Sequence, residues 1–286
     1  MKRSTLLHLR IPFSFFLLPV FLFGSAVVHD FEWWRFGLIF LILHVLLYPA
    51  SNGYNSYFDK DEKSIGGLKN PPKVSKELYY AALLFDLLAL ILGFFISYWF
   101  VLFLLVYGLV SKAYSHPSIR LKKYPIWGWV AAGFFQGYFT VLMVAIGLSP
   151  EGMEAIYETK IQFAAVLSTF LLFGSYPMTQ VYQHEEDAQR GDRTISLILG
   201  IPGTFHFTGL FFAFSVSLFV GFFLTYYSLL EGLVFVASLS PVLVFFGWWY
   251  LRMRKDLSLA NFENTMRLNL ISAICLNGFF GWLIFA

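Results

Sequence analysis

Two short polar segments interrupt an otherwise apolar chain, and they hold the residue types that could do chemistry. They are residues 52–62 and 183–194. In each segment an amide stands four residues before an aspartate: Asn55 precedes Asp59, and Gln183 precedes Asp187. This spacing puts each pair on one face of a helix. Two such faces, brought together at the mouth of a membrane bundle, could hold a divalent metal ion against a phosphorylated ligand.

The oxygen-rich side chains indicate which metal would bind. Mg²⁺ takes one or two carboxylates, keeps several waters and binds phosphate oxygens of a substrate. The single cysteine, Cys275, lies in an apolar run, and His184 has no histidine or cysteine partner at a spacing typical of zinc sites. We therefore expect Mg²⁺, with Asn55, Asp59, Gln183 and Asp187 as its candidate ligands. The alternative is that these acids are solvated helix ends, which two matching clusters make less attractive.

Basic residues in two further segments could neutralise phosphates. Arg120 and Lys122 lie in residues 113–125, and Lys69 lies in a loop rich in glycine and proline. Both segments could equally be anchors on an anionic membrane surface. In the first polar segment, Glu62 shares the face of Asp59 and Asp61 points elsewhere if the helix continues.

The composition predicts a membrane bundle. Of 286 residues, 58% are hydrophobic and 13% charged, against about 25% charged in soluble domains. The net charge of +3 is too small to suggest nucleic acid as a partner. Nine apolar runs are long enough to span a bilayer, so we expect one all-α polytopic domain over residues 1–286. The predicted spans are 11–28, 35–56, 78–97, 98–114, 126–147, 161–182, 204–227, 231–251 and 267–285, with Tyr98 marking the least certain boundary.

The basic residues predict the orientation. If the N-terminus is cytoplasmic, 18 of the 20 basic residues fall on the cytoplasmic side, and only Arg35 and Lys160 fall on the other. Basic residues in short loops favour the cytoplasm. We therefore expect the N-terminus and both polar segments inside, and the C-terminus outside, in the cell (inner) membrane.

The ordered motifs resemble the UbiA superfamily of intramembrane prenyltransferases, and most of all its menaquinone-type branch. Asn52-x-x-Asn55-x-Tyr57-x-Asp59 is similar to the first aspartate-rich motif of that family. Gln183-x-x-x-Asp187-x-x-x-Gly191-x-x-Thr194 is similar to the second. Tyr114-Ser115 with Arg120-Leu121-Lys122 resembles the tyrosine and basic pair after the fourth span. The likeness covers essentially the whole chain.

This resemblance implies a nine-helix bundle around a central cavity with a cytoplasmic cap. It implies Mg²⁺-dependent transfer of a prenyl group from a polyprenyl diphosphate to a lipophilic or aromatic acceptor, such as a quinone precursor, with release of diphosphate. By the resemblance, Asp59, Asp187 and Lys122 carry the reaction. The expected substrate-binding residues are Asn52, Tyr114, Arg120, Lys69 and Arg193.

Two positions depart from the family pattern. Lys63 stands where the first motif usually has a second aspartate, and Gln183 stands where the second motif has its first. Asp61, Glu62 or Glu186 could compensate, and Lys63 could replace a metal's charge. These departures leave room for a non-catalytic relative that binds isoprenoid diphosphates.

A polytopic transporter is the alternative from another class of protein. Asp86 lies inside the third predicted span, where a carboxylate is either functional or a contact between helices. Against a transporter, the sequence shows no inverted repeat with broken helices, and its acids gather at one face. We expect His206 and Asn277 to hydrogen-bond between helices. Asn264, Arg267 and Asn269, near the start of the last span, could reach the cavity, but we favour their interpretation as a positive-inside anchor.

Overall fold

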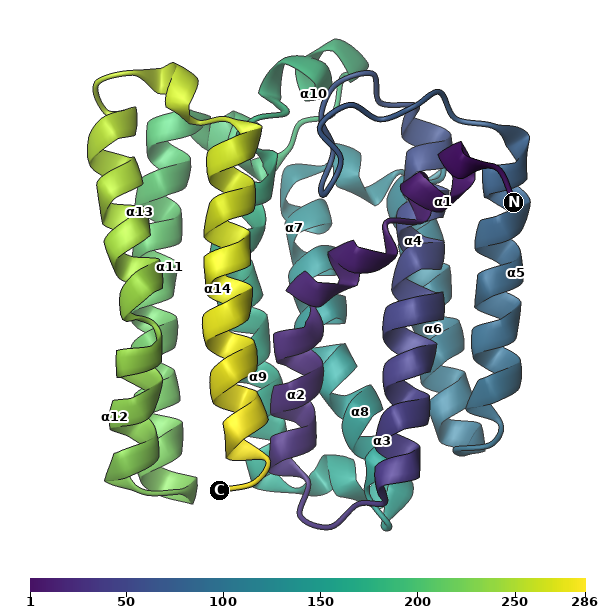
Figure 1. The fold of residues 1–286 in the computed structure, drawn as a ribbon, viewed down its shortest axis with the longest axis vertical. Helices are drawn as coiled ribbons and strands as arrows, with labels where there is room; N and C mark the ends of the chain where they lie inside the picture. Colours follow the sequence, from purple (N-terminus) through teal and green to yellow (C-terminus); the bar gives the residue numbers. More distant parts are fainter.

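The computed structural model describes residues 1–286 and is all-helical, with no β-strand. Long helices stand side by side, and the two chain ends lie at opposite ends of the bundle (Figure 1). The α-helices are α1 (Arg3–Leu9), α2 (Leu18–Val27), α3 (Trp33–Phe40), α4 (Tyr48–Asp59), α5 (Lys76–Gly93), α6 (Tyr98–Ser115), α7 (Pro125–Phe134), α8 (Thr140–Leu148), α9 (Thr159–Ser175), α10 (His184–Arg190), α11 (Ile195–Tyr226), α12 (Leu229–Ser238), α13 (Ser240–Met253) and α14 (Phe262–Leu283).

Shorter 3₁₀ and π turns join or extend these helices. The 3₁₀ turns are η1 (Ile11–Phe16), η3 (Leu121–Lys123), η5 (Gly152–Tyr157), η6 (Tyr176–Gln180) and η7 (Leu257–Leu259), and the π turns are η2 (Leu41–Leu47) and η4 (Phe135–Phe139). Because the π turns run directly into neighbouring α-helices, α3–η2–α4 and α7–η4–α8 are two continuous spans.

Seven helical stretches are long and apolar enough to cross a membrane, and a bent pair of helices makes an eighth. That pair, Arg3–Phe16 and Leu18–Val27, turns by 45°. Pro19 lies at the start of α2, beside the bend. The remaining predicted span corresponds to α5, which has 18 residues but carries three charged ones, Lys76, Glu77 and Asp86. The predicted boundary near Tyr98 is confirmed, since Ser97 caps α6 by accepting a hydrogen bond from the Phe100 amide at 3.1 Å.

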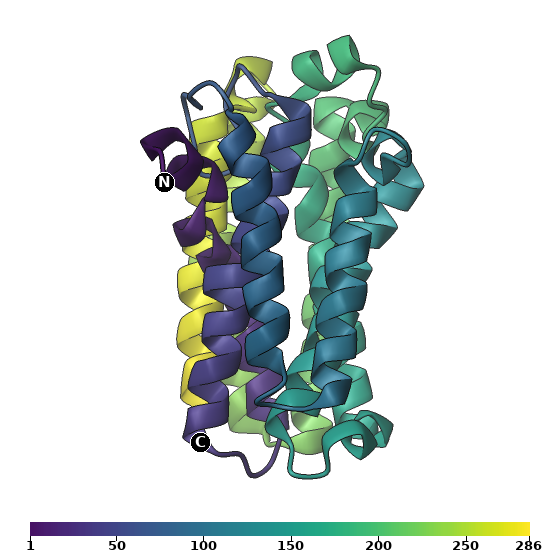
Figure 2. The ribbon, with the colours of Figure 1, turned by 90° about the vertical axis from the view of Figure 1, so that its right-hand side faces the viewer.

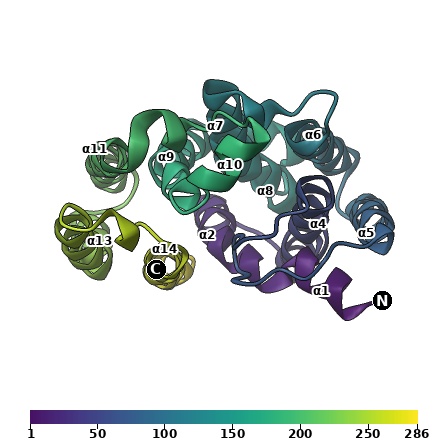
Figure 3. The same ribbon diagram turned by 90° about the horizontal axis from the view of Figure 1, so that it is seen from above.

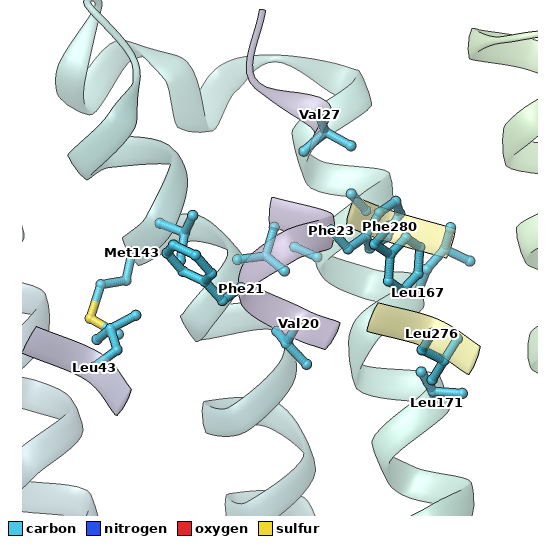
Figure 4. Close-up of a cluster of buried hydrophobic side chains, with 14 of the residues drawn as sticks. Val20, Phe21, Phe23, Val27, Leu43, Met143, Leu167, Leu171, Leu276 and Phe280 are labelled. Carbon is cyan, nitrogen blue, oxygen red and sulfur yellow. The ribbon is translucent and has the colours of Figure 1, made fainter. Parts of the chain in front are cut away.

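The core lies where α2 passes between α8, α9 and α14. Phe23 on α2 stacks on Phe280 of α14 with ring centroids 4.6 Å apart, and Phe21, Met143 and Leu167 pack in the same cluster (Figure 4). Such close packing of side chains is the main force that associates helices in lipid. The outer surface is apolar too, with exposed side chains of Phe95, Leu210, Val244 and Leu251, which is the surface that a bilayer requires.

The π turn η4 turns a polar side chain toward the interior. A π turn leaves one amide without its usual helical acceptor, and the Tyr138 amide instead donates to Thr169 Oγ1 at 2.8 Å. Gly137 makes this approach possible, because a Cβ there would lie only 2.7 Å from the Thr169 backbone. Gln136, in the same turn, lines the interior cavities.

Two segments lie over one end of the bundle. One is the loop between α4 and α5, and the other is α10 with its flanking residues. Both are at the upper end in the two side views, and both cross the middle of the bundle from above (Figures 1, 2 and 3). They touch: the Glu62 amide donates to Glu186 Oε1 at 3.1 Å. The two polar segments of the sequence therefore meet at one end of the molecule.

Candidate active site

A polar cavity of about 290 Å³ lies beneath these two segments. Seven of the predicted site residues line it: Asn52, Asn55, Asp59, Tyr114, Lys122, Gln183 and Asp187. They come from α4, α6, η3 and the start of α10, which are far apart in sequence. The fold thus brings together the two polar segments and the basic segment between them, as the sequence predicts.

Asp59, the last residue of α4, faces two basic side chains. Its Oδ2 forms an ion pair with Lys122 Nζ, and its Oδ1 lies 3.5 Å from Arg120 Nη2. The Asp59 side chain is only 4% exposed, so these cations offset the cost of burying its charge. Arg120 is itself fixed by two parallel hydrogen bonds of 2.8 Å to Asp192, a strong bidentate geometry. These two bonds raise the pKa of Arg120 above its usual value.

Asp187 is buried without a cationic partner within 4 Å. It lies in the first turn of α10, and its Oδ2 accepts a hydrogen bond from Thr194 Oγ1 at 3.3 Å. Burial raises the pKa of Asp187 to about 7, although the charge of nearby Lys122 acts in the opposite direction. Asp187 is therefore the carboxylate of this cavity that most needs a cation.

The two amides keep their oxygens available. Asn55 donates its Nδ2 to Ser115 Oγ at 2.8 Å, and Gln183 donates its Nε2 to the Ser64 carbonyl at 3.4 Å. Gln183 is the N-cap residue of α10, with φ −106° and ψ 0°. Gln183 lies at the start of α10 and not within it, but its carbonyl accepts the Asp187 amide at 2.9 Å, as in a helical turn, and both side chains line the cavity.

The expectation that Asp61 points away from the site is wrong. It assumed that the helix continues, whereas α4 ends at Asp59 and Lys60 takes a left-handed conformation with φ 51°. The turn brings Asp61 into the cavity, where it forms an ion pair with Arg190. Burial and the charge of Asp59 raise the pKa of Asp61. Lys63, two residues after Asp61 in the same loop, is exposed, and its Nζ lies 2.6 Å from Glu185 Oε2.

Three predicted substrate-binding residues do not line the cavity: Arg120 contacts Asp59 from behind the lining, and two others lie further away. Lys69 is on the surface, with its side chain 63% exposed and paired with Glu263. Arg193 is exposed, and its backbone amide donates to the Lys123 carbonyl at 3.1 Å. Neither lines the cavity, because both loops turn their basic side chains outward.

The sequence interpretation missed several lining residues, among them Arg10, Arg190 and Asp192. Arg190 follows Glu186 by four residues, a helical ion-pair spacing that indicates a shared face; the two side chains are 2.6 Å apart. Arg10 donates to the carbonyls of Gly66 and Asn52. Nothing in the sequence linked Arg10 to residues more than forty positions away.

An apolar cavity of about 630 Å³ adjoins the polar one. The two share Phe13, Asn52, Gln136, Tyr176 and Thr179 in their walls. The hydroxyl groups of Tyr114 and Tyr176 meet at the polar side of this boundary. The larger cavity extends between α2, α9, α11, α13 and α14, and Asn269 reaches it. A molecule with a charged head and an apolar tail would match the pair of cavities.

The remaining polar residues that the sequence marks as candidates for contacts within the membrane lie outside the two cavities. Asp86 of α5 forms an ion pair with Lys112 of α6, so it makes a contact between helices. The predicted interhelical hydrogen bonds are confirmed: His206 Nε2 lies 2.7 Å from Tyr250 Oη, and Asn277 Nδ2 donates to the Phe15 carbonyl at 3.4 Å. Asn264 caps the turn before α14 through the Leu259 carbonyl, and Arg267 is exposed.

Fold and site together define an integral membrane protein with a charged cavity at one end of its helical bundle. The model of the UbiA prenyltransferase family matches residues 15–271. The chain belongs to the UbiA prenyltransferase family. A comparison with curated protein sequences finds no match. The predicted likeness to the menaquinone-type branch stays a prediction.

Several solved structures, among them UbiA homologues, have the same fold. A UbiA homologue from Aeropyrum pernix K1, without ligand, has a TM-score of 0.70 at 18% identity over 94% of this chain and 97% of that one. A homologue from Archaeoglobus fulgidus bound to DMAPP and Mg²⁺ has a TM-score of 0.68 at 18% identity over 98% and 99%. A digeranylgeranylglyceryl phosphate synthase has a TM-score of 0.63 at 16% identity over 99% of both chains.

Proposed function

We propose that this protein transfers a prenyl group from a prenyl diphosphate to a lipophilic acceptor in a Mg²⁺-dependent reaction that releases diphosphate. One observation carries the proposal: Asp59 and Asp187, from two distant segments, line one polar cavity with Lys122, and this cavity opens onto a larger apolar one. The family name, and the homologues bound to GPP or DMAPP with Mg²⁺, support the same reaction class.

The residues present fit Mg²⁺. Asp187 lacks a cationic partner within 4 Å, and Asp59 is paired with the flexible Lys122 and, at 3.5 Å, with Arg120. The side-chain oxygens of Asn55 and Gln183 make no hydrogen bond within the protein. These are the oxygen donors that Mg²⁺ prefers, with room left for phosphate oxygens. Bound there, the ion would stabilise the negative charge that builds on the departing diphosphate. We assign Asp59, Asp187, Asn55 and Gln183 to this role.

The chain's own residues would bind the diphosphate and protect the reactive carbon. Lys122 would move from Asp59 toward a phosphate oxygen, since a lysine ammonium is a mobile point charge on a flexible stem. Arg120 stays fixed by Asp192 and adds positive charge nearby. Cleavage of the allylic C–O bond moves its electron pair to the diphosphate and leaves a carbocation. Tyr114 and Tyr176 offer ring faces that favour a cation, and the apolar cavity excludes water.

The acceptor supplies the electron pair for the new carbon–carbon or carbon–oxygen bond and loses a proton. We propose a lipophilic acceptor, with an aromatic quinone precursor as the first class to test. Asn52 and Gln136, which line both cavities, are placed to orient its polar groups.

We also propose that α5 and the bent first pair both cross the bilayer, which gives nine spans in the cell (inner) membrane. An odd number of spans agrees with chain ends at opposite ends of the bundle (Figure 1). The basic residues favour a cytoplasmic N-terminus, so α10 and the loop after α4 would form a cytoplasmic cap over the site.

The reaction can be tested directly on purified protein. Labelled prenyl diphosphates of several lengths are incubated with membrane lipid extract, and products are identified by mass spectrometry with and without Mg²⁺. We expect a prenylated lipid and stoichiometric diphosphate only when Mg²⁺ is present. Binding without product would indicate a non-catalytic relative, and Mg²⁺-independent passage of an unmodified solute through vesicles would indicate a transporter.

A further inference from the structure

Arg190 occupies an unusual position at the polar cavity. Its Nη2 forms an ion pair with Asp61 and lies 2.6 Å from Glu186 Oε1, so one nitrogen bridges two buried carboxylates. The two acids come from different segments, one after α4 and one in α10. The guanidinium lines the cavity, and its Nε and Nη1 groups make no hydrogen bond within the protein. These N–H groups are free to donate to a ligand.

The two positions that depart from the family motifs, Lys63 and Gln183, place no positive charge in the polar cavity. Lys63 points outward to Glu185, and Gln183 is neutral. Arg190 instead brings a fixed positive charge to the side of the cavity where Asp61 lies, and Glu186 holds the guanidinium from outside the cavity lining. A metal ion that displaced Arg190 would have to break two contacts to buried carboxylates and move a guanidinium that is tethered beside them on α10. Arg190 therefore competes with a metal ion for these two acids.

On the side of the cavity formed by Asp59 and Asp187, the carboxylates hold their cations less firmly. Asp59 is paired with the ammonium of Lys122 and, at a longer 3.5 Å, with Arg120, whose guanidinium is fixed by Asp192, and Asp187 has no cation within 4 Å. A lysine that makes one contact gives way to a divalent ion more readily than an arginine held by two carboxylates. Mg²⁺ is usually bound by one or two carboxylates with substrate phosphates. Asp59 and Asp187 therefore provide the carboxylates of one ion.

We propose that this chain binds prenyl diphosphate with one Mg²⁺, held by Asp59 and Asp187, and that the Arg190 guanidinium takes the place of a second ion on the side of Asp61 and Glu186. The inference rests on the proposed function, and it adds a diphosphate-binding residue and a metal count. Arg190 binds the leaving group through the N–H groups that the two acids leave unused.

The test uses the full-length protein in detergent or nanodiscs with a non-hydrolysable prenyl diphosphate analogue. Analogue affinity is measured across a series of free Mg²⁺ concentrations, and bound metal per chain is counted by equilibrium dialysis. In the wild type we expect one ion per chain at saturation, and a slope of about one for log affinity against log free Mg²⁺.

Arg190→Gln should lower analogue affinity at low Mg²⁺ by about ten- to a hundredfold, the usual worth of a charge-assisted hydrogen bond. Because Asp61 and Glu186 then lose their cation, they should take up a second ion, so that the slope rises toward two and high Mg²⁺ restores affinity. Arg190→Lys should keep a slope of one. The double variant Arg190→Gln with Glu186→Gln should lose affinity without gaining a second ion.

Lys63→Gln is the matched control, since Lys63 is exposed on the same segment and should leave slope and stoichiometry unchanged. Two ions in the wild type, or an Arg190→Gln variant that keeps wild-type affinity and slope, would overturn the assignment of Arg190 while leaving the proposed reaction intact. No analogue binding, or binding that ignores Mg²⁺, would overturn the proposed function and the inference together. If Arg190→Gln does not fold, the wild-type ion count and Arg190→Lys still decide the question.

Discussion

Mg²⁺ binding should be linked to release of a proton from Asp187. Burial raises the pKa of this carboxyl from 3.8 to about 7 in the metal-free protein, so near pH 6 most molecules carry a proton there. A metal ligand must be deprotonated. Well below pH 7, each unit of falling pH should therefore weaken Mg²⁺ binding by about tenfold, and between pH 7 and 5.5 the loss should be roughly 15-fold, because the carboxyl is already half-protonated at pH 7. A carboxyl with the ordinary pKa would give almost no change over this range.

Isothermal titration of the purified protein with Mg²⁺, in buffers of different ionisation enthalpy, measures this linkage. We expect about one proton released per ion at pH 6 and close to none at pH 8.5. The same titration on Asp187→Asn is the control, because this variant lacks the titrating group. The number of protons released per ion, which is the slope of the observed binding enthalpy against the buffer ionisation enthalpy, should then be the same at pH 6 and at pH 8.5. Omitting the diphosphate ligand keeps phosphate titration out of the measurement. An affinity in the wild type that stays constant from pH 5.5 to 8.5 would refute the reasoning that a buried, protonated Asp187 must ionise to bind the metal.

Four further outcomes follow from the structure. Lys122→Gln should weaken prenyl diphosphate binding by about ten- to a hundredfold. Lys69→Gln should leave the affinity unchanged, because Lys69 is on the surface. Equal effects of the two variants would contradict the assignment of Lys122 as a diphosphate-binding residue. Asp61→Ala should cost about 1.5–3 kcal/mol of thermal or denaturant stability, because Arg190 loses one of its two charged partners and keeps only Glu186, and a shift within error would contradict the pairing seen here. Gln183→Asp should strengthen Mg²⁺ binding in a calorimetric titration; no change would mean that this side chain does not face the ion. Reporter fusions after Ala286 and near Gly66 should lie on opposite sides of the membrane, and signals from the same side would rule out nine spans.

The sequence predicts the parts of the site that depend on local spacing. Asn55 and Asp59 lie four residues apart on the last turns of α4, and both line the cavity. Seven of the nine predicted spans correspond to continuous helical stretches long and apolar enough to cross a membrane, because apolar runs of this length leave few alternatives in lipid. The first span is instead a pair of helices bent by 45°, which the apolar run alone does not reveal.

The rest of the site depends on contacts between distant segments. Asp61 enters the cavity because Lys60 adopts a left-handed turn, which a non-glycine residue rarely takes and which no propensity predicts. Arg190 is fixed by an acid 129 positions earlier in the chain. The direction of a surface side chain such as Lys69 is set by a partner, Glu263, from the far end of the sequence. Pairings of this kind appear only once the bundle is assembled.

The joint binding of metal and diphosphate at Asp59 and Asp187 is the central claim, and a single ternary binding measurement tests it. Affinity for a non-hydrolysable prenyl diphosphate analogue is measured with saturating Mg²⁺ and with chelator, on the wild type and on Asp59→Asn with Asp187→Asn, with folding checked by circular dichroism. We predict that Mg²⁺ strengthens binding to the wild type by at least about tenfold, and that the folded double variant shows no Mg²⁺ effect. An equal gain from Mg²⁺ in both proteins would contradict the claim.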